Sequence, residues 1–333
     1  RFAPPPPSEE EIVRLRTRRL ADAPDAVRAD FPDWCVPLFV RAFGKGWAEE
    51  AAALSGRPPL DIRVNALKAG REKVLQALKG SGAEPAPIAA DAIRIPPIAG
   101  AGRHPNVQAE PAFQKGWFEI QDEGSQIVAD LAIAGGGAQA LDFCAGAGGK
   151  SLALSAAMKN HGQIFAHDAD KSRLAPIFDR IRRAGARNIQ IVQPSGLPAL
   201  ENAMDLVLVD APCTGSGTWR RRPDSKWRLS DRQLDLRRAE QAAILEDAKR
   251  FVKPGGRLAY ITCSVFSEEN ADQMAAFLGR NGGFRPIDHH ALWNGRHPHR
   301  PDAALVDARG GIVLTPARTG TDGFFCCVLE RRS

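Results

Sequence analysis

Apolar residues recur through the second half of the chain in short runs that alternate with longer amphipathic stretches. The short runs predict strands, and the stretches between them predict helices. The predicted strands lie at 140–143, 163–167, 189–192, 205–209 and 257–262, and the predicted helices at 122–131, 171–184, 232–251 and 268–278. The run at 205–209 (DLVLV) is almost wholly apolar, as a central parallel strand should be. This alternation predicts an α/β fold with a Rossmann-like, mostly parallel sheet, closed by an antiparallel pair at 312–315 and 323–329.

The first part of the chain follows other patterns. After a proline-rich lead at 1–8, helices are predicted from Ser8, at 33–43 and at 47–54, ahead of the pair Pro58-Pro59. Strand patterns at 61–67, 92–95 and 117–121 then surround a predicted helix at 71–78. We therefore expect three parts, which are a helical segment at 1–57, a small α/β module at 58–121 and a larger α/β domain at 122–333.

A glycine-rich turn follows the first strand of the larger domain. The strand at 140–143 breaks at Gly146, Gly148 and Gly149, and a helix begins at Lys150. Glycine allows a sharp turn and the close approach of a ligand, and the helix N-terminus offers unpaired N–H groups. By itself this turn leaves two interpretations open, a nucleotide-type cofactor site or an ordinary tight turn.

Chemically active side chains follow several of the predicted strands. In a doubly wound sheet the ligand lies at the carboxyl ends of the strands. Asp168 ends the second strand, where a carboxylate suits a ribose diol, although it could instead cap the next helix. Cys213 follows Asp210 at one strand end and Cys263 follows the neighbouring strand. One such cysteine is usually a small apolar residue, but two at one crevice indicate nucleophilic chemistry.

Composition and charge limit the classes of protein to which this chain can belong. The 333 residues carry a net charge of +6, which favours an acidic partner such as nucleic acid. The six cysteines show no CxxC spacing, so neither a metal site nor a disulfide framework is indicated. No apolar run reaches transmembrane length and no signal peptide is visible. We expect a cytoplasmic monomer, and the lack of an initiator Met at Arg1 suggests a trimmed chain.

The strongest charge bias lies between Arg220 and Arg238. Eight basic residues stand there against three acidic ones, with Trp219 and Trp227 interleaved. Arginines can neutralise phosphates and indoles can stack on unpaired bases, whereas the alternative is a solvated helix face with packed tryptophans. A weaker pattern of the same kind is the polar alternation of Arg63, Asn65 and Lys68, which could touch nucleic acid or simply face water.

Several motifs together resemble one family. DFCAGAGGK, DAPCTGSGTWRRRPDSKWR and YITCSVFSEEN resemble three motifs of the RNA (cytosine-5) methyltransferases of the Sun/Nop family, closest to bacterial 16S ribosomal RNA methyltransferases of the RsmB type. RVNALK, QDEGSQIVADL and TDGFFCCVLER are also similar, so the resemblance covers residues 57–330. The paired cysteine motifs are highly specific, whereas the glycine turn alone is not.

The resemblance implies S-adenosylmethionine as cofactor, RNA as partner and a catalytic domain at 122–333 preceded by a small RNA-binding subdomain. It assigns Cys263 as the nucleophile and Cys213 as the group that assists release, with Asp210 near the cofactor and the base and Asp168 at the ribose. The cofactor's amino-acid end would be wrapped by the segment Cys144, Ala145, Gly146, Ala147, Gly148, Gly149 and Lys150. Lys150 would also reach the base.

The expected chemistry explains why two thiols are needed. C5 of cytosine is a poor nucleophile, and addition of a thiolate at C6 creates an enamine whose C5 can attack a methyl donor. The base must be flipped out or single-stranded. Two departures from the family pattern stand out. Ala147 replaces a proline, and the run 192–196 lacks the acid that meets the adenine amine, so that Ser195 or a backbone carbonyl would substitute.

Three other interpretations compete with this one. The two cysteines could exchange roles, as in DNA cytosine methyltransferases, although the TCS context of Cys263 argues against it. The chain could be a non-catalytic RNA-binding assembly factor that kept the fold. A dehydrogenase fits least, because it explains neither cysteine motif.

Overall fold

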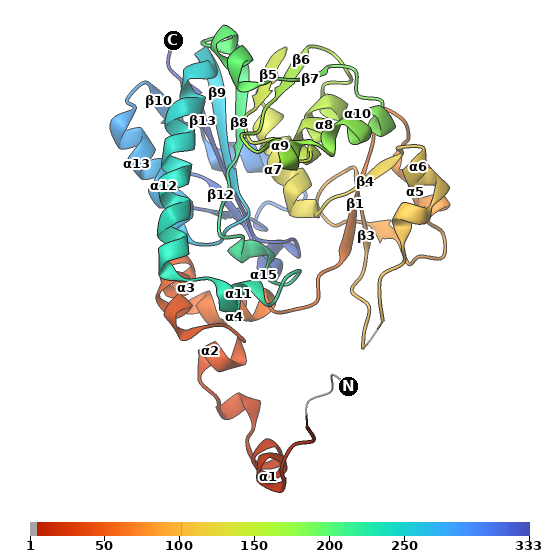
Figure 1. The fold of residues 1–333 in the computed structure, drawn as a ribbon, viewed down its shortest axis with the longest axis vertical. Coiled ribbons are helices and arrows are strands. Elements are labelled where there is room, and N and C mark those ends of the chain that lie inside the picture. Colours follow the sequence, from red (N-terminus) through yellow and green to blue (C-terminus); the bar gives the residue numbers. More distant parts are fainter. Residues whose placement is uncertain (1–4, 101) are drawn as a thin grey trace.

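The computed structural model describes residues 5–100 and 102–333. Residues 1–4 of the predicted proline-rich lead lie outside these ranges. Figure 1 shows a large α/β body with a smaller sheet beside it and a helical arm that extends away from the body at the N-terminal end. Among the described residues, no helix combines the length and apolarity needed to cross a membrane.

Four helices form the N-terminal segment, and only the later ones pack on the body. They are α1 (Glu9–Thr17), α2 (Asp25–Arg28), α3 (Val36–Phe43) and α4 (Trp47–Ala53). The predicted helix start at Ser8 is confirmed, and Ser8 caps α1 in a capping box with Glu11, yet no residue of α1 is buried. Phe39 of α3 has its ring centroid 6.0 Å from that of Trp219 and 5.7 Å from that of Phe266, so α3 belongs to the core of the body.

The smaller sheet is antiparallel, with strand order β2-β3-β1-β4. Its strands are β1 (Leu60–Val64), β2 (Glu84–Pro85), β3 (Ala92–Ile95) and β4 (Phe118–Ile120), and its helices are α5 (Arg71–Ala77) and α6 (Pro111–Gln114). The prediction of β3 is confirmed, and β1 and β4 are shorter than predicted. The two-residue strand β2 and the one-turn helix α6 are too short to leave a periodic pattern, so sequence reasoning missed them.

The large sheet has the order β11-β12-β13-β9-β8-β5-β6-β7, with β10 paired to β13. Its parallel strands are β5 (Gln139–Asp142), β6 (Gln163–Ala166), β7 (Ile189–Ile191), β8 (Met204–Asp210) and β9 (Val252–Thr262). The antiparallel strands are β10 (Phe284–Pro286), β11 (Leu305–Val306), β12 (Ile312–Leu314) and β13 (Phe324–Arg331). The predicted Rossmann-like sheet with a closing antiparallel pair is confirmed. The chain reverses its direction of strand addition between β5 and β8, where a ligand crevice is expected.

Helices cover both faces of this sheet (Figure 1). One apolar core joins the sheet to α12 (Asp231–Ala248) and α13 (Ala271–Arg280). The opposite core joins it to α7 (Glu123–Ile133), α8 (Gly149–Ala157) and α14 (His289–Arg296). The remaining short helices are α9 (Lys171–Leu174), α10 (Ile177–Ala184), α11 (Ser225–Arg228) and α15 (Pro316–Thr319). Burial on both faces explains the continuous apolar run of β8.

The predicted helix at 171–184 is wrong as a single element. The chain forms α9 and α10 instead, with a break at Ala175-Pro176. Pro176 has no N–H to continue the helix, and its ring disfavours helical backbone at the preceding residue. The predicted end of the helix at Ala184 is confirmed, since Gly185 adopts the left-handed conformation that closes a helix.

Candidate active site

The glycine turn after β5 has a backbone geometry that favours glycine. Gly146 and Gly148 have φ values of 49° and 81°, which favour glycine. A Cβ on Gly148 would lie 2.4 Å from the Ile177 Cγ1 atom of α10. The turn is also held from outside, because Arg180 Nη1 donates to the Ala147 carbonyl (2.7 Å) and Arg63 Nη1 donates to the Gly149 carbonyl (2.7 Å). The loop is therefore built into a fixed shape.

The side chains of Arg63 and Asn65 were expected to contact nucleic acid or to face water. Both expectations are wrong, because both side chains are buried. The Asn65 amide donates to the Gly116 and Ala184 carbonyls at 2.8 Å each, and the Lys68 ammonium donates to the Arg183 carbonyl at 2.7 Å. These polar residues of the small sheet tie it to the glycine turn and to the end of α10.

Asp168 lies directly against the glycine turn. Its Oδ2 accepts from the Gly146 backbone N–H at 2.8 Å, and its Oδ1 accepts from the Asp170 N–H at 2.9 Å. The alternative role as a helix cap is wrong for Asp168, because Asp170 caps α9 by accepting from Ser172 N–H. The predicted ribose contact of Asp168 stays a prediction, and its position at the end of β6 is the one that this contact needs.

Asp142 was missed in the sequence. It ends β5, is fully buried, and accepts from the Ser151 hydroxyl at 2.6 Å through Oδ2. Its Oδ1 has no hydrogen-bond partner within the described part of the chain. Burial raises the pKa of the Asp142 carboxyl to about 7. The signal that could have found it is an acid inside an otherwise apolar strand next to a glycine turn.

Lys150 and Asp210 meet across the switch point of the sheet. The Lys150 ammonium donates to Asp210 Oδ2 at 2.6 Å, and the side chains are 7% and 35% exposed. A lysine in the first turn of a helix opposes the helix dipole, so its position indicates a specific partner. The pair places a cation and a partly exposed carboxylate at the mouths of β5 and β8.

The two cysteines converge. The Cys213 and Cys263 Sγ atoms lie 3.3 Å apart, well beyond the ~2.05 Å of a disulfide bond, and both residues are partly exposed. The contact with Cys263 and burial raise the pKa of the Cys213 thiol well above its usual value. Cys213 therefore remains a neutral thiol that can donate to the Cys263 sulfur.

The loops that carry these cysteines are bonded to each other. Gly217 N–H donates to the Cys263 carbonyl at 2.9 Å, and the Ser216 and Ser264 hydroxyls are 2.9 Å apart. Gly217 also has to be glycine, because a Cβ there would lie 2.1 Å from the Gly323 carbonyl oxygen. The thiols thus sit on two loops that pack as one unit.

The basic stretch after Cys213 divides into buried and exposed parts, which partly corrects the prediction. Trp219, Arg220 and Lys226 are buried. Arg220 Nε donates to Asp322 Oδ1 at 2.5 Å, and Lys226 Nζ donates to Asp30 Oδ2 at 2.7 Å. Arg221 Nη2 donates to Asp122 Oδ2 at 2.8 Å. Trp219, Arg220 and Lys226 hold the loop in place and are not free to bind RNA, whereas Arg221 is paired but partly exposed.

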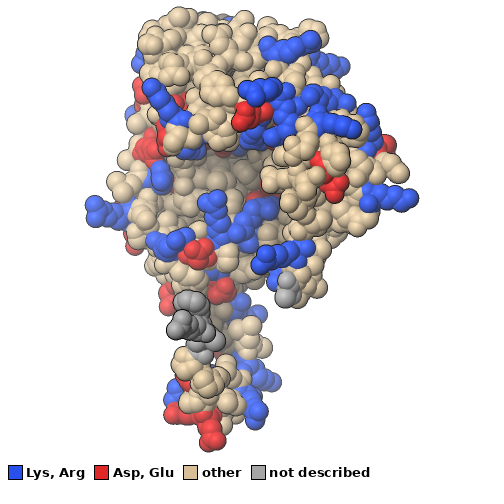
Figure 2. Space-filling view, turned by 45° about the vertical axis from the view of Figure 1, so that its right-hand side comes forward, with Lys and Arg blue, Asp and Glu red and all other residues tan. Residues whose placement is uncertain are grey.

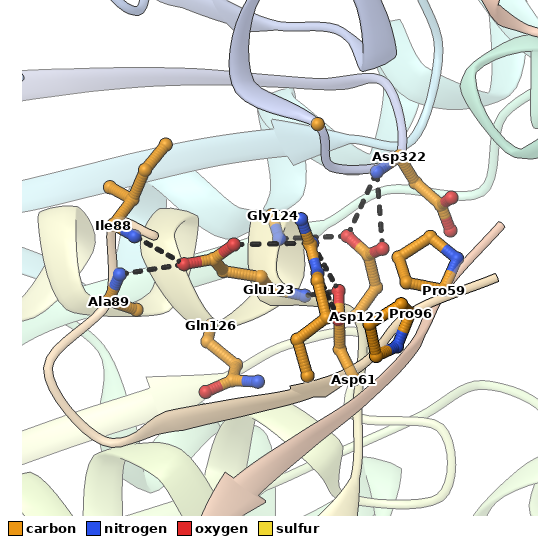
Figure 3. A network of polar contacts seen from close by, with 12 residues as sticks. Pro59, Asp61, Ile88, Ala89, Pro96, Asp122, Glu123, Gly124, Gln126 and Asp322 are labelled. Atoms are coloured by element: carbon orange, nitrogen blue, oxygen red, sulfur yellow. Dashed lines mark hydrogen bonds and ion pairs between the residues drawn. The ribbon is translucent and has the colours of Figure 1, made fainter. Parts of the chain in front are cut away.

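Figure 3 shows the acidic junction that receives these arginines. Asp122 accepts from the Asp322 backbone N–H at 3.1 Å, and Glu123 accepts from the Ile88 and Ala89 N–H groups. Glu123 N–H in turn donates to Asp61 Oδ2 at 2.9 Å. The small sheet, α7 and the loop before β13 therefore meet at this junction.

The exposed remainder of the stretch still suits a nucleic acid. Trp227 is 57% exposed, and the exposed cations are Arg222, Arg228, Arg232, Arg237 and Arg238. A hollow of about 480 Å³ beside Cys213 is lined by residues that include Thr214, Arg228 and Arg237. Figure 2 shows Lys and Arg side chains around a recessed face of the molecule.

The strand order, the glycine turn and the acids at the ends of β6 and β8 define the Rossmann-like fold of methyltransferases. The chain belongs to the 16S rRNA methyltransferase RsmB/F family, which matches residues 132–330, and the ferredoxin-like domain of that family matches residues 31–97.

Known proteins of similar sequence or structure agree with this family assignment. Ribosomal RNA small subunit methyltransferase B of Klebsiella pneumoniae (strain 342) is 34% identical over 311 residues, or 90% of this chain. The chain spans 66% of that relative's length, just under two thirds. The crystal structure of PH0851 has a TM-score of 0.80 at 28% identity, over 99% of this chain and 70% of that one. NSun6 from Pyrococcus horikoshii with SFG has the same fold, with a TM-score of 0.74 at 21% identity over 91% of this chain and 99% of its own.

Proposed function

We propose that this chain transfers a methyl group from S-adenosylmethionine to C5 of a cytosine in RNA, with 16S ribosomal RNA as the substrate. The observation that carries the proposal is the 3.3 Å separation of the Cys213 and Cys263 sulfurs at the carboxyl edge of the sheet. A purely structural pair of thiols would not need to lie partly exposed beside Asp210. Membership of the RsmB/F family supports the same reaction class.

The residues around the glycine turn fit the cofactor. Gly146 and Gly148 have positive φ, and Asp142 Oδ1 is a buried acceptor without a partner among the described residues. An acceptor of this kind suits the cofactor's ammonium group, and Asp168 suits its ribose. Bound here, S-adenosylmethionine would supply an electrophilic methyl group on a sulfonium. The segment 144–150, with Lys150 at the start of α8, would hold its amino-acid end.

The two thiols have different roles in this proposal. The Cys263 thiolate adds to C6 of cytosine, and the electron pair of the C5–C6 double bond becomes available at C5 for attack on the methyl group. A base then removes the C5 proton, the C5–C6 double bond re-forms and the thiolate leaves. Because the raised pKa keeps Cys213 protonated, its S–H can stabilise the Cys263 thiolate and assist release.

In this proposal Asp210 and Lys150 hold the base. The part of Asp210 that is exposed can accept from the cytosine N4 amino group, while the ion pair with Lys150 orients the carboxylate. Because the Lys150 ammonium donates a hydrogen bond to Asp210, a contact between Lys150 and the base would lie next to the Asp210 carboxylate. The exposed arginines after Trp227 would bind the phosphates, and Trp227 would stack on an unpaired base.

Single-turnover assays with each cysteine variant test this proposal. Cys263→Ala should abolish methyl transfer to 16S ribosomal RNA while cofactor binding, measured by calorimetry, persists. Cys213→Ala should instead accumulate a protein–RNA adduct that survives denaturing electrophoresis. Normal turnover by Cys263→Ala would refute the nucleophile assignment. Failure of the unaltered chain to bind the cofactor would favour a non-catalytic assembly factor.

A further inference from the structure

Glu269 and Asn270 are buried neighbours in the chain, and their side chains contact the two loops that carry Cys213 and Cys263. Neither residue has a role in the proposed reaction. Glu269 is fully buried, and it accepts from Thr214 N–H at 2.8 Å and from the Thr214 hydroxyl at 2.5 Å. Thr214 directly follows Cys213. Gln241 of α12 donates to the same carboxylate at 2.9 Å and to the Pro212 carbonyl at 3.0 Å, so both sides of Cys213 are fixed.

Asn270 makes the corresponding contacts with the other loop. Its Oδ1 accepts from the Thr262 hydroxyl at 2.6 Å, and its Nδ2 donates to the Ser264 carbonyl at 2.9 Å. Thr262 and Ser264 flank Cys263. Both Thr262 and Ser264 are fully buried, so these bonds are not exchanged with water.

We propose that Glu269 and Asn270 are positioning residues that set the separation and direction of the two sulfurs. Glu269 governs the Cys213 loop and therefore release, whereas Asn270 governs the Cys263 loop and therefore capture of the base. Because the two residues are neighbours in the chain, movement of one loop is resisted by the other. The chemical consequence of this positioning rests on the proposed function, whereas the contacts of Glu269 and Asn270 are independent of it.

The backbone near Glu269 strengthens this assignment. The Tyr260 hydroxyl donates to the Glu269 carbonyl at 2.7 Å, and Tyr260 lies in β9, two residues before Thr262. The turn that carries Glu269 and Asn270 is thereby fixed to the same strand that ends at Cys263. The neighbouring Glu268 faces away from both loops, where it accepts from Arg41 at 2.8 Å. Glu268 is therefore a matched control in the same turn.

The test compares Glu269→Ala, Glu269→Gln and Asn270→Ala with Cys213→Ala, Cys263→Ala and the control Glu268→Ala. Misplacing a reacting group by an ångström costs about 100-fold, so turnover should fall by about that factor in Glu269→Ala. Glu269→Ala should also accumulate the protein–RNA adduct, as Cys213→Ala does. Asn270→Ala should form little adduct, as Cys263→Ala does. Glu268→Ala should behave as the unaltered chain.

Glu269→Gln distinguishes position from charge. The glutamine oxygen can accept from Thr214 N–H and from Gln241, and the Thr214 hydroxyl can turn to accept from the new amide. We therefore expect turnover close to that of the unaltered chain. Adduct-free, normal turnover by Glu269→Ala would overturn the proposal. The proposal would also be overturned if Glu269→Ala and Asn270→Ala showed the same defect and lost cofactor affinity equally. That result would indicate general misfolding.

Two further measurements keep the idea testable. If Glu269→Ala does not melt cooperatively, Thr214→Ala, which removes the hydroxyl and the γ-methyl group but keeps the backbone N–H bond to Glu269, should give a smaller accumulation of adduct, and no accumulation would count against the proposal. If Cys213→Ala fails to trap RNA, the proposed release role of Cys213 is refuted while the positioning is still open to test. Diamide, a thiol oxidant, should then join Cys213 to Cys263 more slowly in Glu269→Ala than in Glu269→Gln, as followed by intact mass. Equal rates would refute the positioning.

Discussion

Lys150 Nζ and Asp210 Oδ2 lie 2.6 Å apart, across the point where the large sheet reverses its strand order. The lysine side chain is only 7% exposed, whereas the aspartate is 35% exposed. The pair thus presents a carboxylate to the crevice and hides the cation behind it. The contact also satisfies the Lys150 ammonium, because a buried cation without such a partner would be poorly solvated.

Removal of this cation should impair catalysis more than binding. Lys150→Met should lower kcat by about 100-fold, since an oriented charged group at the reacting base acts mainly in the transition state. KM for the cofactor should change little. Steady-state assays against Lys79→Ala, an exposed lysine on the small sheet's side of the molecule, provide the comparison. A change in KM alone would show that Lys150 serves only to bind the cofactor.

The arginines that sequence reasoning assigned to RNA should instead control stability. The Arg220 and Asp322 side chains are 5% and 3% exposed, and Arg220→Met removes the buried partner of the Asp322 carboxylate and leaves it paired with the partly exposed Arg221. Breaking such a pair costs about 3–5 kcal/mol. Urea unfolding should show this loss for Arg220→Met and almost none for the exposed Arg222→Ala. The double variant Arg220→Met with Asp322→Asn should be less destabilised than Arg220→Met, and an additive loss would contradict the pairing.

Trp227 should contribute to RNA affinity without affecting the chemistry. A base stacked on an indole contributes about 1–3 kcal/mol, so Trp227→Ala should raise the Kd for an unpaired 16S ribosomal RNA fragment roughly tenfold or more. Arg232→Gln should reduce the salt dependence of binding, measured by titration at several salt concentrations. Arg250→Gln is the control, because this arginine pairs with Glu201 beyond the opposite end of β8. An unchanged Kd for Trp227→Ala would place the RNA elsewhere.

His289 should make the fold sensitive to mild acid. Its Nε2 accepts from Val328 N–H at 2.9 Å, and burial lowers the pKa of the imidazole from 6.5 to about 4. The unfolded chain therefore binds a proton between these two values while the native chain does not, so stability falls as pH drops from 6.5 toward 4. The group's contribution lost over that interval is ~3 kcal/mol.

Urea unfolding at pH 7 and at pH 5 measures this effect. His289→Gln keeps an acceptor for Val328 N–H but cannot be protonated, so its free energy of unfolding should depend less on pH than that of the unaltered chain. Equal pH dependence in the two chains would show that another group is responsible. His297, whose pKa is also lowered to about 4 by burial, accounts for part of any remaining dependence.

Patterns of apolar residues were enough to predict the five parallel strands and the closing antiparallel pair of the large domain, but not β10, β11, α14 or α15. The near-continuous apolar run of β8 indicates a strand buried on both faces, and the glycines before α8 indicate a sharp turn between strand and helix. Each of these patterns restricts the backbone strongly. The break at Pro176 was visible in the sequence but was outweighed by the helical periodicity around it. The strand-end positions of Cys213, Cys263, Asp168 and Asp210 followed from the same pattern.

Only the tertiary structure decided which polar residues face inward. Arg63, Asn65, Arg220 and Lys226 have the composition of an RNA surface, yet each is buried with partners far away in the chain. The sequence determined the class of fold and the chemistry available at the strand ends, because both depend on local pattern and residue type. It could not determine the 3.3 Å separation of the thiols or the contacts of Glu269, because these arise from segments that meet only when the chain is packed.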